Sequence, residues 1–550
     1  MSYRGNLPLP SKHNNCHFIL ILGIKVSVIN FYFSSPQSLL QTSKMTRRII
    51  SSLNAATAPG EMTPTVGNKQ GAQVGLDESP TPPASTAPPS DFGAGVTDLT
   101  GAAKKHVYTI IKAKLVIPGA ENPIPDGAVV IKDKLIAWVG PQSSLPSRFT
   151  SVPHRLIGVP YLMPGLWDVH AHFDGESPSD SEPSYLGVLT TPQATAGARL
   201  AKGCWEALQR GYTSLRDVAG FGCEVAKAIE DGTIVGPNIY SSGACLSQTA
   251  GHGDVFSMPA GDVLLRLGVS TVTPGHFGSN ASMLCDGVEE CRKAVRLQIR
   301  RGARVIKVFA SGGVLSRDDN PLYAQFSKEE LDCIVSEAAR QGRVVAAHVH
   351  GKPGILAAVK AGVATVEHVS FADDECVDLM KEKGTVFVST RTIIEVLMSN
   401  GERGLPKENW EKLKLVATNH RKAYELAIQK GVRLALGTDT GPGFNMAVEL
   451  EYAVKCGLNN LEAIKAATAN GPLTVGPQAP LTGQLKEGYE ADLIAVSENP
   501  VEDVKVLQKH SNITWVWKGG RVFKGPGVGP WGEGYTLTDG IGPLHATPSF

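Results

Sequence analysis

The chain has 550 residues, of which 42% are hydrophobic and 19% charged. This is enough apolar material for a sizeable core, and it excludes a wholly disordered or fibrous protein. The 53 Lys and Arg against 52 Asp and Glu leave a formal net charge of +1, which indicates neither nucleic acid nor a stable membrane association. Nine cysteines without a CxxC pair argue against a disulfide scaffold or a zinc ribbon.

The first 104 residues differ in composition from the rest of the chain. An apolar run at 17–33 is typical of the core of a targeting segment, but Met45 begins a second start-like stretch, so residues 1–44 can equally be a gene-model extension. Both readings stay open: the chain is secreted in the first case and cytoplasmic in the second. Residues 56–104 are rich in Pro, Ala, Gly, Ser and Thr, so we expect residues 1–104 to form a disordered leader.

Ordered structure is predicted from about residue 105, and the two ends of the ordered chain have the same sequence pattern. Short strand-like segments joined by Gly, Pro and Asp turns fill 105–163 and return at 479–534. They predict one small β domain built from both ends, with residues 535–550 as a tail.

The middle, 164–478, alternates apolar strand-like runs with helical stretches that end in glycine. Eight such runs are predicted as strands: Tyr161–Gly165, Tyr212–Val218, Asn238–Ser242, Arg304–Ala310, Arg343–His348, Ala364–His368, Gly384–Thr390 and Val432–Gly437. Eight repeats predict an α/β fold, a TIM (β/α)8 barrel. An open doubly wound sheet is disfavoured because no glycine-rich phosphate loop follows the first strand. The insertion from Cys245 to Cys285 is expected to be a loop over the barrel mouth.

Six residues suited to metal binding fall at or near the carboxyl ends of the predicted strands: His170, His172, Lys307, His348, His368 and Asp439. This is the face at which barrel enzymes build active sites. Side chains alternate along a strand, so His170 and His172 point the same way and can hold one cation. Each residue alone has an ordinary structural explanation, such as a hydrogen-bonded core histidine. Their convergence on one face predicts a metal centre.

Further positions are predicted around this centre. His252, in the insertion, is expected to donate to an oxyanion or to bind substrate, and His350 to bind a substrate carboxylate or to orient a neighbour. Gly312 and Gly313 would let the backbone approach the substrate closely. Asp168 is expected to hold a ligand imidazole.

The order HxH–Lys–His–His–Asp resembles the signature of the metal-dependent amidohydrolase superfamily. Within it, SSGACLSQTAGHGD, ASGGVLSRDDNP and AIKAATANGPL resemble fungal ochratoxinases, which hydrolyse the amide joining phenylalanine to a dihydroisocoumarin acid. The resemblance covers roughly residues 105–534. It implies a TIM barrel beside a β-sandwich from both termini, and a homo-oligomer.

The resemblance also implies two divalent metal ions, most often zinc. His170, His172 and Asp439 would hold the first, and His348 and His368 the second. The matching lysine of the family is carbamylated by CO₂, and Lys307 is therefore expected to bridge the two ions as a carboxylate analogue.

The expected activity is hydrolysis of the amide bond of ochratoxin A or of a similar small N-acyl aromatic amino acid, with a metal-bridging hydroxide as nucleophile. Asp439 would pass the remaining proton to the leaving amine. An Xaa-Pro-type dipeptidase or an imidazolonepropionase-like hydrolase would share the metal ligands and stays an alternative. A non-catalytic scaffold descended from amidohydrolases is disfavoured because all six ligands are kept.

Two other features depend on the compartment or have a plain structural explanation. Asn280 and Asn512 begin glycosylation sequons, which matter only in a secreted chain. The scattered cysteines are expected to be buried thiols rather than nucleophiles.

Overall fold

The computed structural model describes residues 107–175, 191–254, 282–402 and 405–535, together with the backbone of a short hairpin near the N-terminus. The hairpin pairs β1 (Phe18–Leu22) with β2 (Lys25–Ile29) in antiparallel fashion. It gives regular structure to part of the predicted leader, where apolar and β-branched side chains favour extended backbone. The rest of residues 1–104 lies outside the described residues.

One seven-stranded sheet takes its strands from both ends of the main unit, in the order β19-β18-β17-β6-β3-β4-β5. Its strands are β3 (Tyr108–Val116), β4 (Ile124–Lys132), β5 (Leu135–Pro141), β6 (His154–Pro164), β17 (Leu493–Val496), β18 (Ile513–Lys518) and β19 (Arg521–Lys524). A short helix, α2 (Ser147–Thr150), precedes β6.

Strand β6 joins the two ends of the chain within this sheet. It runs parallel to β3 on one side and antiparallel to β17 on the other. Buried side chains from both ends, including Ile111, Val129, Leu493 and Trp517, form one cluster. The two ends that were expected to make a β-sandwich are therefore hydrogen-bonded into a single mixed sheet, because β6 is long enough to pair with both.

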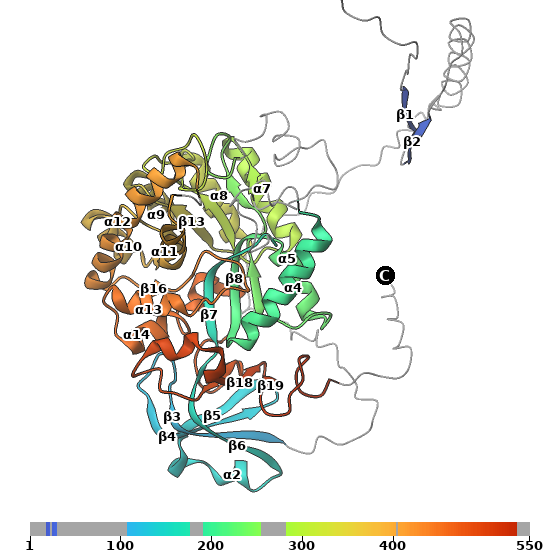
Figure 1. The fold of residues 1–550 in the computed structure, drawn as a ribbon, viewed down its shortest axis with the longest axis vertical. Helices are drawn as coiled ribbons and strands as arrows, with labels where there is room; N and C mark the ends of the chain where they lie inside the picture. The colour runs from blue at the N-terminus through green and yellow to red at the C-terminus, as the bar shows by residue number, and fades with distance from the viewer. Residues whose placement is uncertain are drawn as a thin grey trace, which may run out of the picture. The chain divides into compact units, whose positions relative to one another are not determined.

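The middle of the chain alternates parallel strands with helices that flank them (Figure 1). A three-stranded sheet contains β7 (Leu166–Phe173), β8 (Tyr212–Gly220) and β9 (Asn238–Ser241). A seven-stranded sheet has the order β11-β10-β12-β13-β14-β15-β16, with bounds β10 (Cys245–Ser247), β11 (Ser282–Leu284), β12 (Ile306–Phe309), β13 (Val345–Val349), β14 (Thr365–His368), β15 (Val386–Val388) and β16 (Leu434–Ala435). The predicted α/β class is confirmed.

The main helices follow the strands in chain order. They are α4 (Gln193–Gln209), α5 (Gly222–Glu230), α7 (Gly287–Arg301), α8 (Lys328–Arg340), α9 (Lys352–Ala361), α10 (Asp374–Lys383), α11 (Arg391–Asn400), α12 (Lys407–Lys430), α13 (Val448–Lys455) and α14 (Asn460–Ala466). Helix α12 ends at Lys430 and is followed by Gly431, whose φ of 70° is left-handed, as expected of a glycine C-cap.

Backbone hydrogen bonds connect the two parallel sheets at two places. The Arg304 amide donates to the Ser241 carbonyl at the end of β9, at 2.8 Å, and the Asp439 amide donates to the His170 carbonyl, at 2.7 Å. The second contact places the chain that follows β16 beside the end of β7. Residues far apart in sequence thus meet where the predicted ligands lie.

The predicted strands differ from the structure in two places. The strand that ends in the histidine pair is β7, whereas Tyr161–Gly165 overlaps the end of β6 in the mixed sheet. The apolar run continues across Pro164 and Gly165, so the sequence pattern does not reveal this boundary. The insertion after β9 begins and ends as strands β10 and β11, which pair in parallel and are too short to show a periodicity. Its residues 255–281, with Asn280, lie outside the described part.

Three remaining expectations concern single features. The described cysteines are buried free thiols, as predicted. Asn512 is buried and donates through Nδ2 to the Val506 carbonyl, at 3.0 Å, so a glycan there would require the amide to leave the core. Within the described ranges, no helix combines the length and the apolar character needed to cross a membrane.

Candidate metal centre

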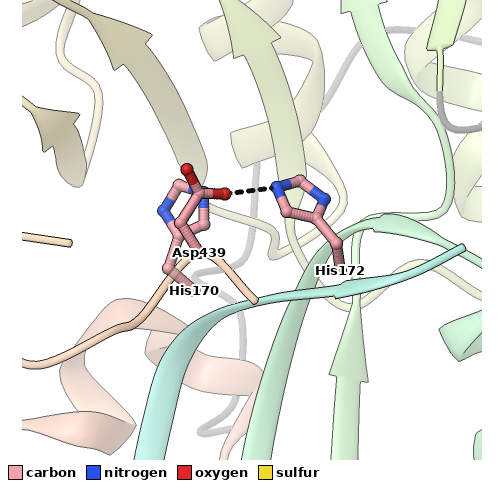
Figure 2. Close-up of side chains that lie close together, drawn as sticks. All are labelled: His170, His172 and Asp439. Atoms are coloured by element: carbon pink, nitrogen blue, oxygen red, sulfur yellow. Dashed lines mark ion pairs between the residues drawn. The ribbon is translucent and has the colours of Figure 1, made fainter. Parts of the chain in front are cut away.

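The first group of predicted ligands meets near the carboxyl end of β7, which carries both histidines, and beyond the end of β16, which Asp439 follows (Figure 2). His172 Nε2 lies 2.8 Å from Asp439 Oδ1, and His170 Nε2 lies 3.4 Å from the same oxygen. All three ligand atoms lie within 4.8 Å of one another. Ligands of one tetrahedral cation stand about 3.4 Å apart, so this spacing suits a metal ion.

Each imidazole of this group is held through its Nδ1 atom. His170 Nδ1 lies 2.8 Å from Glu367 Oε2, and His172 Nδ1 lies 3.3 Å from the Ala219 carbonyl. These contacts turn both Nε2 atoms toward the carboxylate that they share. Such outer partners are what fix the tautomer and orientation of metal-binding histidines.

The second group of predicted ligands lies next to the first. The ring of His368 is 4.6 Å from that of His348 and 5.0 Å from that of His170, between centroids. His348 Nε2 lies 3.3 Å from the Gly312 carbonyl, and His368 Nδ1 lies 2.7 Å from Thr390 Oγ1. The remaining nitrogen of each ring is the one that a cation could use.

Three residues of the site have left-handed backbone. The φ angles are 68° at His368, 53° at Thr390 and 62° at Asp439. This region is unfavourable for residues other than glycine, and such strain concentrates at functional sites, where the surrounding structure maintains it. Here it falls on two predicted ligands and on the partner of one of them.

Charge is distributed unevenly among the ligands. Burial opposes ionisation of Asp439, but contacts with His170 and His172 outweigh it and hold the pKa of the carboxyl well below its ordinary value. Burial lowers the pKa of His348 and of His368 well below the ordinary value. These two rings are therefore neutral, which is the form that binds cations.

Lys307 lines the same pocket and is 1% exposed. Burial lowers the pKa of its amine from the ordinary value, more than the negative charge of Glu367 raises it. A buried ammonium without adequate compensation is costly. The structure thus places Lys307 among the other five predicted ligands, in a setting that favours its neutral form.

Glu367 is a residue of the site that the sequence reasoning missed. It is fully buried and accepts two hydrogen bonds from Arg216 Nη2, both 2.8 Å long. Burial opposes its ionisation, yet the charge of Arg216 holds the pKa of the carboxyl below its ordinary value. The signal that could have identified Glu367 is a glutamate inside a strand, β14, whose four residues are all buried.

Asp168 was expected to orient an imidazole. Instead, its carboxylate accepts from the His170 backbone amide at 2.9 Å and from Thr438 Oγ1 at 2.6 Å.

The two predicted substrate histidines lie beside the second ligand group. The rings of His252 and His348 stack with centroids 4.4 Å apart, and His252 Nδ1 lies 2.7 Å from Ser316 Oγ. His350 Nδ1 lies 2.8 Å from Ser370 Oγ. Both histidines line the pocket that contains the ligands.

Gly312 and Gly313 have a structural explanation in addition to the predicted one. A Cβ atom at Gly313 would lie 2.1 Å from the His252 ring, and one at Gly312 would lie 2.2 Å from the Asn320 carbonyl oxygen. Only glycine therefore leaves room for His252 in its observed position. Direct contact of either glycine with a substrate stays a prediction.

A pocket of about 240 Å³ contains all six predicted ligands together with His252 and His350. Its remaining surface is largely apolar, and we call this part the apolar wall: it includes Val314, Leu315, Ile393, Leu397, Leu413 and Val416. The pocket thus combines a polar, metal-binding floor with a surface suited to a hydrophobic group.

Comparison with known proteins agrees with this chemistry. Residues 161–523 match the model of the Amidohydrolase family. The chain is 61% identical over 426 residues to ochratoxinase from Aspergillus niger, which covers 77% of this chain and 88% of that protein. The crystal structure of A. niger ochratoxinase matches with a TM-score of 0.75 and 60% identity over 78% of this chain and 98% of that one.

More distant relatives share the fold. The crystal structure of a Xaa-Pro dipeptidase with bound methionine matches with a TM-score of 0.66 and 30% identity. The match covers 76% of this chain and 100% of that one. The family model spans most of the chain, and its ligand pattern converges in one pocket. The chain therefore belongs to the amidohydrolase family, as a metal-dependent hydrolase of amide bonds.

Proposed function

We propose that this enzyme hydrolyses the amide bond of ochratoxin A or of a similar small N-acyl aromatic amino acid and releases the amino acid. The observation that carries the proposal is the single pocket in which six potential metal ligands adjoin the apolar wall. The likeness to ochratoxinase, at 61% identity, supports the choice of substrate.

The scaffold proposed for this site is a closed (β/α)8 barrel with the mixed sheet as an additional domain. Eight parallel strands, β7–β9 and β12–β16, supply it, and the backbone hydrogen bonds between the two parallel sheets support closure. The ligands then lie at the carboxyl ends of the strands, the usual position of barrel active sites.

His170, His172 and Asp439 would hold one divalent cation, and His348 and His368 a second. Imidazole and carboxylate donors suit zinc, which we take as the expected metal. Two such ions would polarise the scissile carbonyl and lower the pKa of a water molecule.

Lys307, carbamylated by CO₂, is proposed as the anion shared by the two ions. The neutral amine, which burial favours here, carries the lone pair that adds to CO₂. The addition releases one proton and converts the neutral amine into an anionic carbamate, which would offset the charge of the metal ions.

The side chains have separate roles in the proposed reaction. Asp439, held ionised by its histidine neighbours, accepts the proton of the attacking water and returns it to the leaving amine. His252 donates to the oxyanion or to the substrate carboxylate, and His350 binds that carboxylate. A homo-oligomer is expected, as in the sequence-based prediction.

A second candidate function is that of an Xaa-Pro dipeptidase. The 30% identity to such an enzyme over its whole length favours it. Proline is smaller than phenylalanine, so the two candidates differ in how much of the apolar wall the leaving amino acid would use.

The test is a hydrolysis assay of the purified protein with ochratoxin A, N-acyl-phenylalanines and Xaa-Pro dipeptides, combined with metal analysis. We expect about two divalent ions per chain and the highest kcat/KM for the phenylalanine amides. Faster cleavage of the Xaa-Pro dipeptides would contradict the proposed substrate and favour the second candidate.

A further inference from the structure

The apolar wall is built by two helices and a loop that also hold polar residues of the site. Leu315 comes from the loop after β12, Ile393 and Leu397 from α11, and Leu413 and Val416 from α12. These elements pack against one another through a common hydrophobic cluster. The wall is therefore part of a built structure rather than an accidental set of exposed side chains.

Only some of its side chains are accessible to a bound molecule. Leu413 and Val416 are 1% and 0% exposed, so they support the wall from behind. Ile393 and Leu397 are half-buried and stand one turn apart on α11, where side chains four positions apart lie on the same face. Leu315 is 37% exposed. Leu315, Ile393 and Leu397 therefore present an accessible apolar surface to the pocket.

The wall lies next to the predicted carboxylate-binding histidines. Its loop also carries Ser316, whose Oγ lies 2.7 Å from His252 Nδ1. Helix α11 begins directly after Thr390, whose Oγ1 lies 2.7 Å from His368 Nδ1. Apart from Phe309 and Ile394, the rest of the pocket, with His172, is lined by polar or small groups.

We propose that the apolar wall binds the side chain of the leaving amino acid and that Ile393 and Leu397 determine the preference for a large apolar one. The α-carbon of that amino acid bears both the carboxylate and the side chain. A carboxylate at His252 and His350 therefore places the side chain within reach of the adjoining wall. The acyl half then extends toward His172. This inference deepens the proposed function and rests on it.

The test uses two substrate series on the metal-loaded enzyme. One series keeps the acyl group and varies the leaving amino acid among phenylalanine, leucine and alanine; the other keeps phenylalanine and varies the acyl group. Removing part of an apolar contact reduces kcat/KM by about tenfold or more. Leu397→Ala should therefore lower the preference for phenylalanine over alanine about tenfold and leave the order of acyl groups unchanged.

Two further variants make the result specific. Val396→Ala changes an apolar residue of the same helix that is absent from the pocket lining, so it should leave both orders unchanged. Leu397→Trp enlarges the side chain, so that it occupies the space proposed for the leaving side chain. It should lower kcat/KM for the phenylalanine substrate more than for the alanine substrate. The melting temperature and metal content of each variant separate a local effect from unfolding.

Three outcomes overturn the inference. A changed order of acyl groups with an unchanged order of amino acids would place the acyl half at the wall. If both Leu397 variants keep the wild-type order of amino acids and of acyl groups, the wall does not bind the substrate. If the wild-type enzyme cleaves neither series, the proposed function itself fails and the inference fails with it, which is distinguishable from the first two results.

Discussion

Two buried ionisable groups in or next to the pocket, Lys307 and Glu367, differ in their charge state. Lys307 is 1% exposed and its pKa is lowered by burial. Glu367 is 0% exposed and is ionised because Arg216 donates to both of its oxygens. One group thus tends to lose its charge while the other keeps it, and the difference follows from whether a rigid opposite charge is within hydrogen-bond distance.

Lys307→Ala should reduce the amount of bound divalent metal and lower kcat at least about a hundredfold, because the bridging anion is lost. Short carboxylates such as acetate or propionate should restore part of the activity. Metal analysis and initial rates measure both effects, and Lys360→Ala, at an exposed lysine of α9, is the control. Two bound ions and full activity in Lys307→Ala would refute the carbamate.

Glu367→Gln should destabilise the fold by about 3–5 kcal/mol at neutral pH, because it leaves the buried Arg216 charge without its partner. The folded-state pKa of Glu367 lies below its ordinary value of 4.5. Its stabilising contribution is therefore complete above that value and is lost as the pH falls below it toward the folded-state pKa. The stability difference between wild type and variant should shrink over that window.

Denaturant unfolding at several pH values measures this difference. Glu329→Gln, at an exposed position of α8, is the matched control and should change stability little at any pH. A difference for Glu367→Gln that stays constant down to pH 3 would show that the carboxylate is not the stabilising form.

Among the elements, α11 affects the site in two ways: it begins directly after Thr390, the partner of the predicted ligand His368, and it carries part of the apolar wall. Its N-terminus is fixed by Glu449, a buried carboxylate on α13 that accepts from Ser389 Oγ at 2.5 Å and from the amides of Arg391 and Thr392 at 3.0 and 2.7 Å. An acidic group at a helix N-terminus satisfies unpaired amides and complements the helix dipole. Glu449 therefore fixes where Thr390 and the first turns of α11 lie.

Glu449→Ala should destabilise the protein by about 3 kcal/mol, since several buried donors lose their acceptor. It should also lower kcat/KM for phenylalanine amides more than for alanine amides, because the wall on α11 is no longer held in place. Glu449→Gln, which keeps one acceptor oxygen, should be milder in both respects. Equal losses for the two substrates would indicate general destabilisation only.

At the scale of the whole molecule, the mixed sheet ties the two ends of the main unit together. Strand β17 pairs with β6, which leads directly into β7 and the histidine pair. Trp517 and Leu493, from the C-terminal part, share a buried cluster with Ile111 and Val129 from the N-terminal part. The first ligand strand is therefore anchored to a structure that requires both ends of the chain.

A protein that begins at Lys104 should be folded and active, because the strands described in the main unit start at Tyr108. Removal of residues 491–550, by contrast, should prevent folding, since it deletes β17 to β19 and exposes the buried cluster around Trp517. Circular dichroism and the hydrolysis assay check both variants. Failure of the first to fold would give the leader a structural role.

The sequence alone was sufficient to predict that the six candidate ligands come together. Residue type and strand periodicity select His170, His172, His348 and His368, because parallel strands bring their carboxyl ends to one face. All four, with Lys307 and Asp439, line one pocket. The α/β class was likewise readable, since strand and helix periods alternate along the chain.

Only the tertiary structure decided which groups surround these ligands. Glu367 binds an arginine 151 positions away, and no local pattern reveals such a partner. Ile393 and Leu397 look like ordinary core residues in the sequence, and they become pocket lining only through the placement of α11. The boundary between β6 and β7 is hidden by a continuous apolar run. In each case the deciding interaction is long-range, whereas sequence periodicity reports only which face of an element is apolar.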